Sequence, residues 1–298
     1  MAGFDESFRS LMIASQSKLS LKNANLLVER PEKDAVSVPL SDINCIMLES
    51  PAITLTSALL SAIADNKITL LCCDSTHQPN GIFMPYLTHY QSNSVIKSQI
   101  AQTRQHKAIL WQSIIKIKIQ NQANFVRKFD KKVGDELLNL SKKVVLGDTK
   151  NCEGIAAAKY FKTLFGKDFS RDEPIWINSA LNYVYAIIRS QVVRNIASSG
   201  LLPIFGVGHD NIFNNFNLAD DLMEPYRIFG DRLVLGLYDD SKDTFLTTKD
   251  KANLSGVLEV TTKISGKKFN LAMAITKSVQ SYKNSLNSGI CELEFGEI

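Results

Sequence analysis

The alternation of hydrophobic and polar residues before residue 90 is typical of short β-strands. Four runs are β-branched or alternate between apolar and polar positions, and Asn23-Ala24-Asn25, Pro31 and Pro39 interrupt them: LMIAS, KLSLKNANLLVER, AVSVPL and INCIML. Apolar residues at helical spacing predict one helix over Thr54–Asp65. KITLLCCD and GIFMPY predict two further strands around a Pro-Asn-Gly turn. The pattern therefore predicts a small β-rich domain over residues 1–88.

The pattern changes after His89, and the remaining segments are typical of helices. From Asn93 to Lys143 there is one glycine and no proline. The run at 114–119 alternates like a strand, but its flanks favour a helix. Further helices are expected from Asn151, over Trp176–Ser199, over Asp231–Tyr238 and over Lys267–Leu286, while Gly256–Ser265 fits either a strand pair or a helix. Gly200 and Pro203 are expected to end the most apolar of these helices. We therefore predict an α+β protein of two domains, with residues 89–298 forming a larger all-α domain.

Composition indicates an ordinary globular chain of 298 residues, 45% hydrophobic and 21% charged. No run of about 18 apolar residues exists, and the first residues lack the apolar core of a secretory signal, so no membrane segment is expected. The five cysteines are odd in number and show no CxxC spacing. Reduced thiols in a cytoplasmic protein fit this pattern.

Positive charge is concentrated in one segment. Residues 97–143 hold 11 Lys/Arg against 3 Asp/Glu, which is +8, whereas the whole chain carries +4. Such asymmetry predicts a polyanionic partner, because each phosphate neutralised by a basic side chain releases counterions. A lysine-rich helix face exposed only to solvent is the alternative.

The stretch Gly200–Arg227 holds the clearest candidate chemistry. His209 follows Gly206-Val207-Gly208, and Asp221 and Glu224 lie three residues apart, on one face if the segment is helical. One imidazole with carboxylates suits Mg²⁺ or Mn²⁺ better than a structural zinc.

Such a site needs another oxygen ligand, and Glu153 is the candidate. It lies in the first turn of a predicted helix, immediately before Gly154 and three alanines that permit close approach of another helix. The alternative is simple compensation of the helix dipole.

Taken together, these motifs resemble a known family. CEGIAAAKYF, ALNYVYAIIRSQV, GLLPIFGVGH and DDLMEPYR are similar to the CRISPR-associated endonuclease that integrates new spacers, and WQSIIKIKIQNQ resembles its type II version. The resemblance spans essentially the whole chain. It departs at Tyr226, where phenylalanine is common, and at Ile228, where proline usually follows the arginine.

The resemblance implies a metal site of Glu153, His209 and Glu224, with Asp221 as a supporting carboxylate. It implies strand transfer in antiviral defence, in which a DNA 3′-hydroxyl attacks a phosphodiester at the repeat boundary. With water as the nucleophile, the same Mg²⁺- or Mn²⁺-dependent site would act as a nuclease.

The resemblance also implies a homodimer paired through the β-rich domains, and a heterocomplex in which a small dimeric CRISPR-associated subunit bridges two such dimers. The partner is double-stranded DNA, both the captured fragment and the repeat. The basic segment supplies the expected backbone contacts: Arg104, Lys116, Lys118, Arg127 and Lys128.

Three other functions are compatible with parts of the sequence. A non-catalytic DNA-binding scaffold would keep the basic helices but need no ligand set. A metal-dependent phosphohydrolase acting on a small substrate would not need so large a basic segment. A cysteine hydrolase could use Cys152 with His209, although no nucleophile turn surrounds the cysteine.

Overall fold

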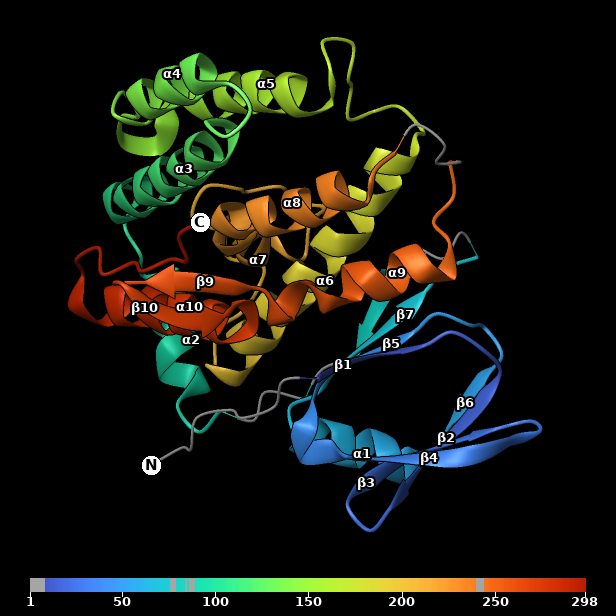
Figure 1. Ribbon diagram of the computed structural model, residues 1–298. Helices are drawn as coiled ribbons and strands as arrows, with labels where there is room; N and C mark the ends of the chain where they lie inside the picture. The colour runs from blue at the N-terminus through green and yellow to red at the C-terminus, as the bar shows by residue number, and fades with distance from the viewer. Residues whose placement is uncertain (1–8, 76–78, 84, 86–88, 240–243) are drawn as a thin grey trace.

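The computed structural model describes residues 9–75, 79–83, 85, 89–239 and 244–298. Figure 1 shows a β-rich N-terminal part beside a larger assembly of helices that contains the C-terminus. This arrangement confirms a mixed α/β protein with strands first and helices after.

Two four-stranded sheets form the N-terminal part. The first has the order β1 (Arg9–Ile13), β5 (Ile43–Leu48), β7 (Thr69–Cys73) and β8 (Pro79–Phe83), in which only β8 runs antiparallel to its neighbour. The second has the order β4 (Lys33–Pro39), β3 (Asn25–Arg30), β2 (Ser17–Lys22) and β6 (Ile53–Leu55). The predicted strands are therefore confirmed, and a turn at Asn23 and Ala24, both with positive φ, reverses the chain between β2 and β3.

One apolar core joins these two sheets to helix α1 (Ser57–Asp65). Leu59 and Ile63 of α1 are fully buried against Leu19, Leu26 and Ile46 of the sheets. The Thr56 side chain accepts a hydrogen bond from the Leu59 backbone N–H and caps the helix. The predicted helix is confirmed, with its first turn beginning at Ser57.

The C-terminal part is built around two 23-residue helices, α3 (Arg104–Val126) and α6 (Trp176–Ser198). Helix α3 packs against η2, α4, α5, η3, α7 and α8, and α6 packs against α7, α8, α9 and α10. The surrounding elements are α2 (Ser92–Ile100), α4 (Lys131–Ser141), η2 (Leu146–Asp148), α5 (Cys152–Phe165), α7 (Asn217–Met223), η3 (Glu224–Tyr226), α8 (Arg227–Leu237), α9 (Thr248–Ser255), η4 (Gly256–Glu259) and α10 (Leu271–Ser288). Both long helices match the sequence prediction.

Gly200 follows α6 with a φ of +79°, a left-handed conformation that glycine adopts readily, and so ends this helix as predicted.

The prediction of an all-α C-terminal domain is wrong in one place. Strands β9 (Thr261–Ile264) and β10 (Lys267–Asn270) form an antiparallel hairpin, so the ambiguous stretch Gly256–Ser265 holds a short 3₁₀ helix, η4, followed by one strand of that hairpin. Ser265 and Gly266 both have positive φ and form the tight turn between them. The last long helix therefore begins at Leu271, where Asn270 caps it, rather than at Lys267.

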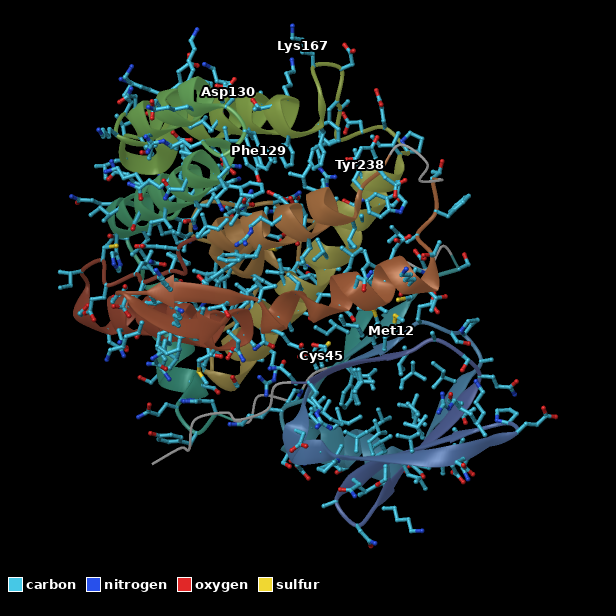
Figure 2. All side chains as sticks on the ribbon, in the orientation of Figure 1. Met12, Cys45, Phe129, Asp130, Lys167 and Tyr238 are labelled. Atoms are coloured by element: carbon cyan, nitrogen blue, oxygen red, sulfur yellow. The ribbon has the colours of Figure 1, made fainter. Side chains whose placement is uncertain are left out.

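The N-terminal sheet packs directly against the helical part. Cys45, Met47 and Leu71 belong to the same apolar cluster as the buried face of α6. The Tyr183 hydroxyl contacts the Met47 sulfur at 2.8 Å, and Met12 and Cys45 lie along this seam in Figure 2. The predicted domain boundary after residue 88 falls at the edge of residues 86–88, which lie outside the described part of the chain.

Among the described residues, no helix combines the length and apolar character that crossing a bilayer requires.

Candidate functional site

Glu153 projects from the first turn of α5, and other side chains already cap that turn. The Asp148 carboxylate accepts hydrogen bonds from the backbone N–H groups of Cys152 and Glu153, both at 2.9 Å. Asn151, in a left-handed conformation, accepts a third from Gly154 at 3.1 Å. Because the exposed N–H groups of the turn have these acceptors, the Glu153 carboxylate is not needed for capping and is available for chemistry.

Asp221 holds the loop that carries His209. Its carboxylate is fully buried and accepts four hydrogen bonds. Oδ2 accepts from the backbone N–H groups of Val207 at 2.5 Å and Gly208 at 3.0 Å, and Oδ1 accepts from the His209 N–H at 3.0 Å. The imidazole Nδ1 of His209 lies 2.6 Å from Oδ1. Both oxygens of Asp221 are therefore engaged by the loop that carries His209, and its role beside a metal stays a prediction.

The hydrogen bond to Asp221 fixes the orientation of the His209 imidazole. With Nδ1 engaged, Nε2 is the ring nitrogen available to a ligand. The same hydrogen bond raises the pKa of His209, and it outweighs the opposing effect of partial burial. The Trp111 ring packs edge-on against the imidazole with centroids 5.4 Å apart.

Gly206 and Gly208 are required by close approach rather than by unusual φ angles. A Cβ atom at Gly206 would lie 2.1 Å from the His209 carbonyl oxygen, and one at Gly208 would lie 2.2 Å from the Trp111 ring. Neither glycine has positive φ. The packing around the loop therefore requires both glycines.

Glu224 lies where α7 changes into the 3₁₀ turn η3, immediately before Pro225. It is only 4% exposed, yet two cations surround it. Arg227 Nε donates to Oε1 at 3.0 Å, and Lys118 Nζ lies 2.5 Å from Oε2. Burial opposes ionisation, but Arg227 and then Lys118 outweigh it and lower the pKa of Glu224 to about 2. The carboxylate is therefore charged at neutral pH.

Lys118 was expected on a DNA-contacting surface, and the structure places it in the interior instead. Its side chain is 10% exposed, and its Nζ lies 2.6 Å from Glu153 Oε1 as well as 2.5 Å from Glu224 Oε2. Desolvation would lower the pKa of Lys118, but Glu224 and Glu153 together raise it. Sequence reasoning missed this role because Lys118 was counted with the other charges of the basic segment.

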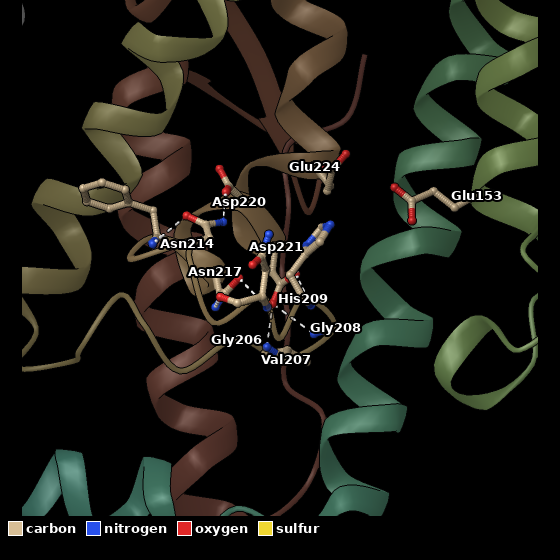
Figure 3. A network of polar contacts seen from close by, with 12 residues as sticks. Glu153, Gly206, Val207, Gly208, His209, Asn214, Asn217, Asp220, Asp221 and Glu224 are labelled. Carbon is tan, nitrogen blue, oxygen red and sulfur yellow. Dashed lines mark hydrogen bonds and ion pairs between the residues drawn. The ribbon is translucent and has the colours of Figure 1, made fainter. Parts of the chain in front are cut away.

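Figure 3 shows Glu153, His209 and Glu224 turned toward one space between α3, α5 and the loop before α7. Both glutamate charges also raise the pKa of His209, although less than the Asp221 hydrogen bond does. The structure thus brings together the three residues predicted from segments distant in sequence.

Donor chemistry at this position fits a divalent cation. Two carboxylates and one imidazole nitrogen suit Mg²⁺ or Mn²⁺, and the buried Oε2 of Glu224 accepts no hydrogen bond of ordinary geometry. Within the described part of the chain, however, no three His, Cys, Asp or Glu side chains are close enough to ligate an ion as they stand. The physical reason is visible at Lys118, whose ammonium occupies the position between the two carboxylates.

The other predicted DNA contacts do not form one patch. Arg104 begins α3, whereas Arg127 and Lys128 follow its last residue; all three are exposed and Lys116 is half-buried. At about 1.5 Å per residue, the two ends of this helix are about 30 Å apart. Arg127 also pairs with Asp135 at 3.0 Å.

Two arginines of α6, Arg189 and Arg194, contact different parts of the protein. Arg194 is buried and donates to the carbonyl of Lys67 at the seam between the sheet and the helices. Arg189 pairs with Asp220 at 3.8 Å and lies over the Phe216 ring. Arg194 therefore has a structural role.

Cys152 is not suited to nucleophilic catalysis. It is buried, and burial followed by the charge of Asp148 raises the pKa of its thiol. A raised pKa disfavours the reactive thiolate, which contradicts the cysteine-hydrolase alternative.

Comparison with known proteins shows the family to which the chain belongs. Residues 11–261 match the family described as CRISPR associated protein Cas1. The chain is 37% identical over 278 residues to a CRISPR-associated endonuclease Cas1 of Neisseria meningitidis serogroup C (strain 8013), which covers 93% of this chain and 91% of the relative.

Two solved structures share the fold. One, a casposase bound to integration product, superposes with a TM-score of 0.76 at 18% identity, covering 94% of this chain and 91% of the other. The other, from a Cas6-RT-Cas1–Cas2 complex, superposes with a TM-score of 0.73 at 20% identity, covering 96% of this chain and 35% of that longer chain. On the extent of the sequence match, the chain belongs to the Cas1 family of CRISPR-associated proteins.

Proposed function

We propose that this protein is a Mg²⁺- or Mn²⁺-dependent DNA strand-transferase that inserts short DNA fragments into a CRISPR array. The observation that carries the proposal is that Glu153 and Glu224, from separate segments, share one cation at Lys118, with the His209 side chain turned toward the same space. Membership of an endonuclease family and the fold shared with a casposase support it.

Glu153, Glu224 and the Nε2 of His209 would hold the metal ion. When bound, such an ion polarises a phosphodiester and stabilises the negative charge that develops during phosphoryl transfer. The donor set is anionic and partly buried, which favours a doubly charged cation over a monovalent one.

The remaining groups position those three ligands. Asp221 fixes the imidazole through Nδ1, and Arg227 fixes one oxygen of Glu224. A ligand side chain that is held by a hydrogen bond from another residue is already oriented, so it loses less conformational entropy when the ion binds. Loss of either support should therefore weaken the site without removing a ligand.

The proposed substrate is double-stranded DNA, bound chiefly through its backbone. Exposed basic side chains at both ends of α3, among them Arg104 and Lys128, are the candidate phosphate contacts. Their wide separation suits a long duplex better than a small phosphorylated metabolite, which disfavours the phosphohydrolase alternative.

We further propose a homodimer that associates with a small Cas2-type subunit in the cytoplasm. The structural neighbour from a Cas1–Cas2 assembly supports the second partner. Strand β4 lies at the edge of its sheet, and its largely exposed side chains include Val36. An exposed edge of this kind is a candidate surface for pairing with a second copy.

The test uses purified protein, its partner subunit, a labelled duplex with free 3′-hydroxyls and a repeat-containing plasmid. Label should join the plasmid with Mg²⁺ or Mn²⁺ and not with EDTA. Glu153→Ala, His209→Ala and Glu224→Ala should each abolish joining, whereas Glu136→Ala, which removes an exposed carboxylate paired with Lys159, should not. Joining by any of the first three variants at the wild-type rate would refute the assignment.

A further inference from the structure

Lys118 occupies the position that a metal ion would need. Its Nζ lies 2.6 Å from Glu153 Oε1 and 2.5 Å from Glu224 Oε2, so one ammonium bridges two carboxylates from different elements. A hexacoordinate Mg²⁺ holds oxygen ligands at about 2.1 Å. Glu153 Oε1 and Glu224 Oε2 already lie on either side of one nitrogen atom, so they need to move little to bind the same metal ion.

The two cations beside Glu224, Arg227 and Lys118, contact different carboxylate oxygens. Arg227 donates to Oε1 of Glu224 and makes no ion pair with Glu153 among the contacts of the described chain. Lys118 alone contacts both glutamates and the otherwise unsatisfied Oε2. An incoming ion could thus leave Arg227 in place but would compete with Lys118 for the same oxygens.

The backbone beneath Lys118 is fixed, whereas its side chain can move. The neighbouring residues Ile114, Ile115 and Ile119 are fully buried in the core around α3. The lysine reaches the carboxylates on a flexible four-carbon stem, and the site opens to solvent at His209, whose side chain is 42% exposed. Lys118 can therefore leave the carboxylates without any change in the helix.

We propose that Lys118 is a positioning residue that acts as an exchangeable internal counter-ion: it holds Glu153 and Glu224 together in the metal-free protein and is displaced when a divalent cation binds. Without it, two buried or half-buried carboxylates would face each other, and the Arg227 ion pair would offset Glu224 but not Glu153. With it, the site stays assembled but binds metal more weakly, because each ion must first displace an ammonium. This inference rests on the proposed metal-binding role of the two glutamates.

The first test uses the wild-type protein and does not depend on a variant folding. Lysines are acylated briefly with an N-hydroxysuccinimide ester, with and without Mn²⁺, and modification is read by mass spectrometry. Labelling of Lys118 should rise several-fold with Mn²⁺. Lys251 is the matched control, since it is also buried and pairs with Glu49 at 2.6 Å without contacting Glu153 or Glu224; its labelling should not change. Equal protection of Lys118 with and without bound Mn²⁺ would overturn the displacement.

The second test compares Lys118→Met with Lys251→Met by Mn²⁺ titration and thermal unfolding. Both variants leave a buried glutamate without its ammonium and should melt below the wild type in EDTA. Only Lys118→Met should recover when Mn²⁺ is added, and its Mn²⁺ dissociation constant should fall roughly tenfold or more, because the competing charge is gone.

The outcomes separate this inference from the proposed function. Equal Mn²⁺ affinity of wild type and Lys118→Met, or weaker binding by the variant, would overturn the role of Lys118 alone. Absence of Mn²⁺ binding by both proteins would overturn the metal site itself, and the inference with it.

Discussion

Replacing Asp221 with asparagine tests whether this buried carboxylate organises the histidine loop. The substitution keeps shape and removes the charge. It also puts an amide –NH₂ where a carboxylate oxygen now accepts two hydrogen bonds, either from Val207 and Gly208 or from the backbone and ring of His209. Two buried donors then lose their acceptor, each at a cost of about 1–3 kcal/mol. We therefore expect Asp221→Asn to lower the free energy of unfolding by about 2–6 kcal/mol.

The same change should lower the pKa of His209, because the Asp221 hydrogen bond is the largest cause of its elevation. A raised folded-state pKa contributes stability below the unfolded value of about 6.5, and that contribution is lost as pH rises through the folded pKa. The difference in unfolding free energy between wild type and Asp221→Asn should therefore be larger at pH 6 than at pH 9.

Urea unfolding at both pH values, with NMR titration of the imidazole, measures both effects. Asp220→Asn is the matched control: the neighbouring carboxylate accepts one hydrogen bond from Asn214 at 2.7 Å and lies 3.8 Å from Arg189. It should change stability by less than about 1 kcal/mol. A loss below 1 kcal/mol in Asp221→Asn with an unshifted His209 pKa would refute this account of the loop.

Three further perturbations test other parts of the structure. The pKa of Glu224 is lowered to about 2 in the folded protein, so its ionised form stabilises the fold above the unfolded pKa of about 4.5. Urea unfolding measured at a series of pH values should show a loss of about 3 kcal/mol in unfolding free energy as pH falls from 4.5 to 2. Glu224→Gln should lack this loss. Tyr226→Phe removes a hydroxyl that contacts Ser278 Oγ at 2.5 Å and accepts from the Gly296 N–H at 3.2 Å, and should cost about 1–3 kcal/mol in urea unfolding; a change under 0.5 kcal/mol would argue that these contacts contribute little. Replacing Arg104 and Lys128 with glutamine should reduce the slope of log binding constant against log salt concentration by up to about two, because two phosphate contacts are lost. Lys118→Gln should leave that slope unchanged. A slope that falls only for Lys118→Gln would show that Lys118 contacts DNA.

Much of the fold could be read from the sequence because its patterns are local. The breaker-free segment before residue 130 became α3, and Gly200 ends α6 through a left-handed φ that glycine adopts readily. The hairpin at β9 and β10 could not be decided, since short segments bury too few residues to establish a period of two or of 3.6.

In the candidate site, too, some residues could be selected from the sequence and one could not. Residue types and resemblance selected Glu153, His209 and Glu224, whose metal-binding role stays a prediction, together with Asp221, whose carboxylate accepts four hydrogen bonds. Lys118 could not be identified, because a charge count along the chain does not distinguish a lysine facing solvent from one facing two carboxylates. That distinction depends on how α3 packs against α5 and η3.

Tyr226 is a second instance of this limit. A departure from the phenylalanine common in the family gave no indication of its role. In the structure its hydroxyl ties η3 to Ala274 and Ser278 of α10 and to Gly296 near the C-terminus. Hydrogen bonds between segments distant in the chain leave no periodic signal.

Anomalous diffraction from crystals soaked in Mn²⁺ tests the central claim most directly. The account predicts one strong manganese peak ligated by Glu153, Glu224 and the Nε2 of His209, with the Lys118 ammonium moved away from both carboxylates. Manganese bound elsewhere, with Lys118 still bridging Glu153 and Glu224, would contradict it.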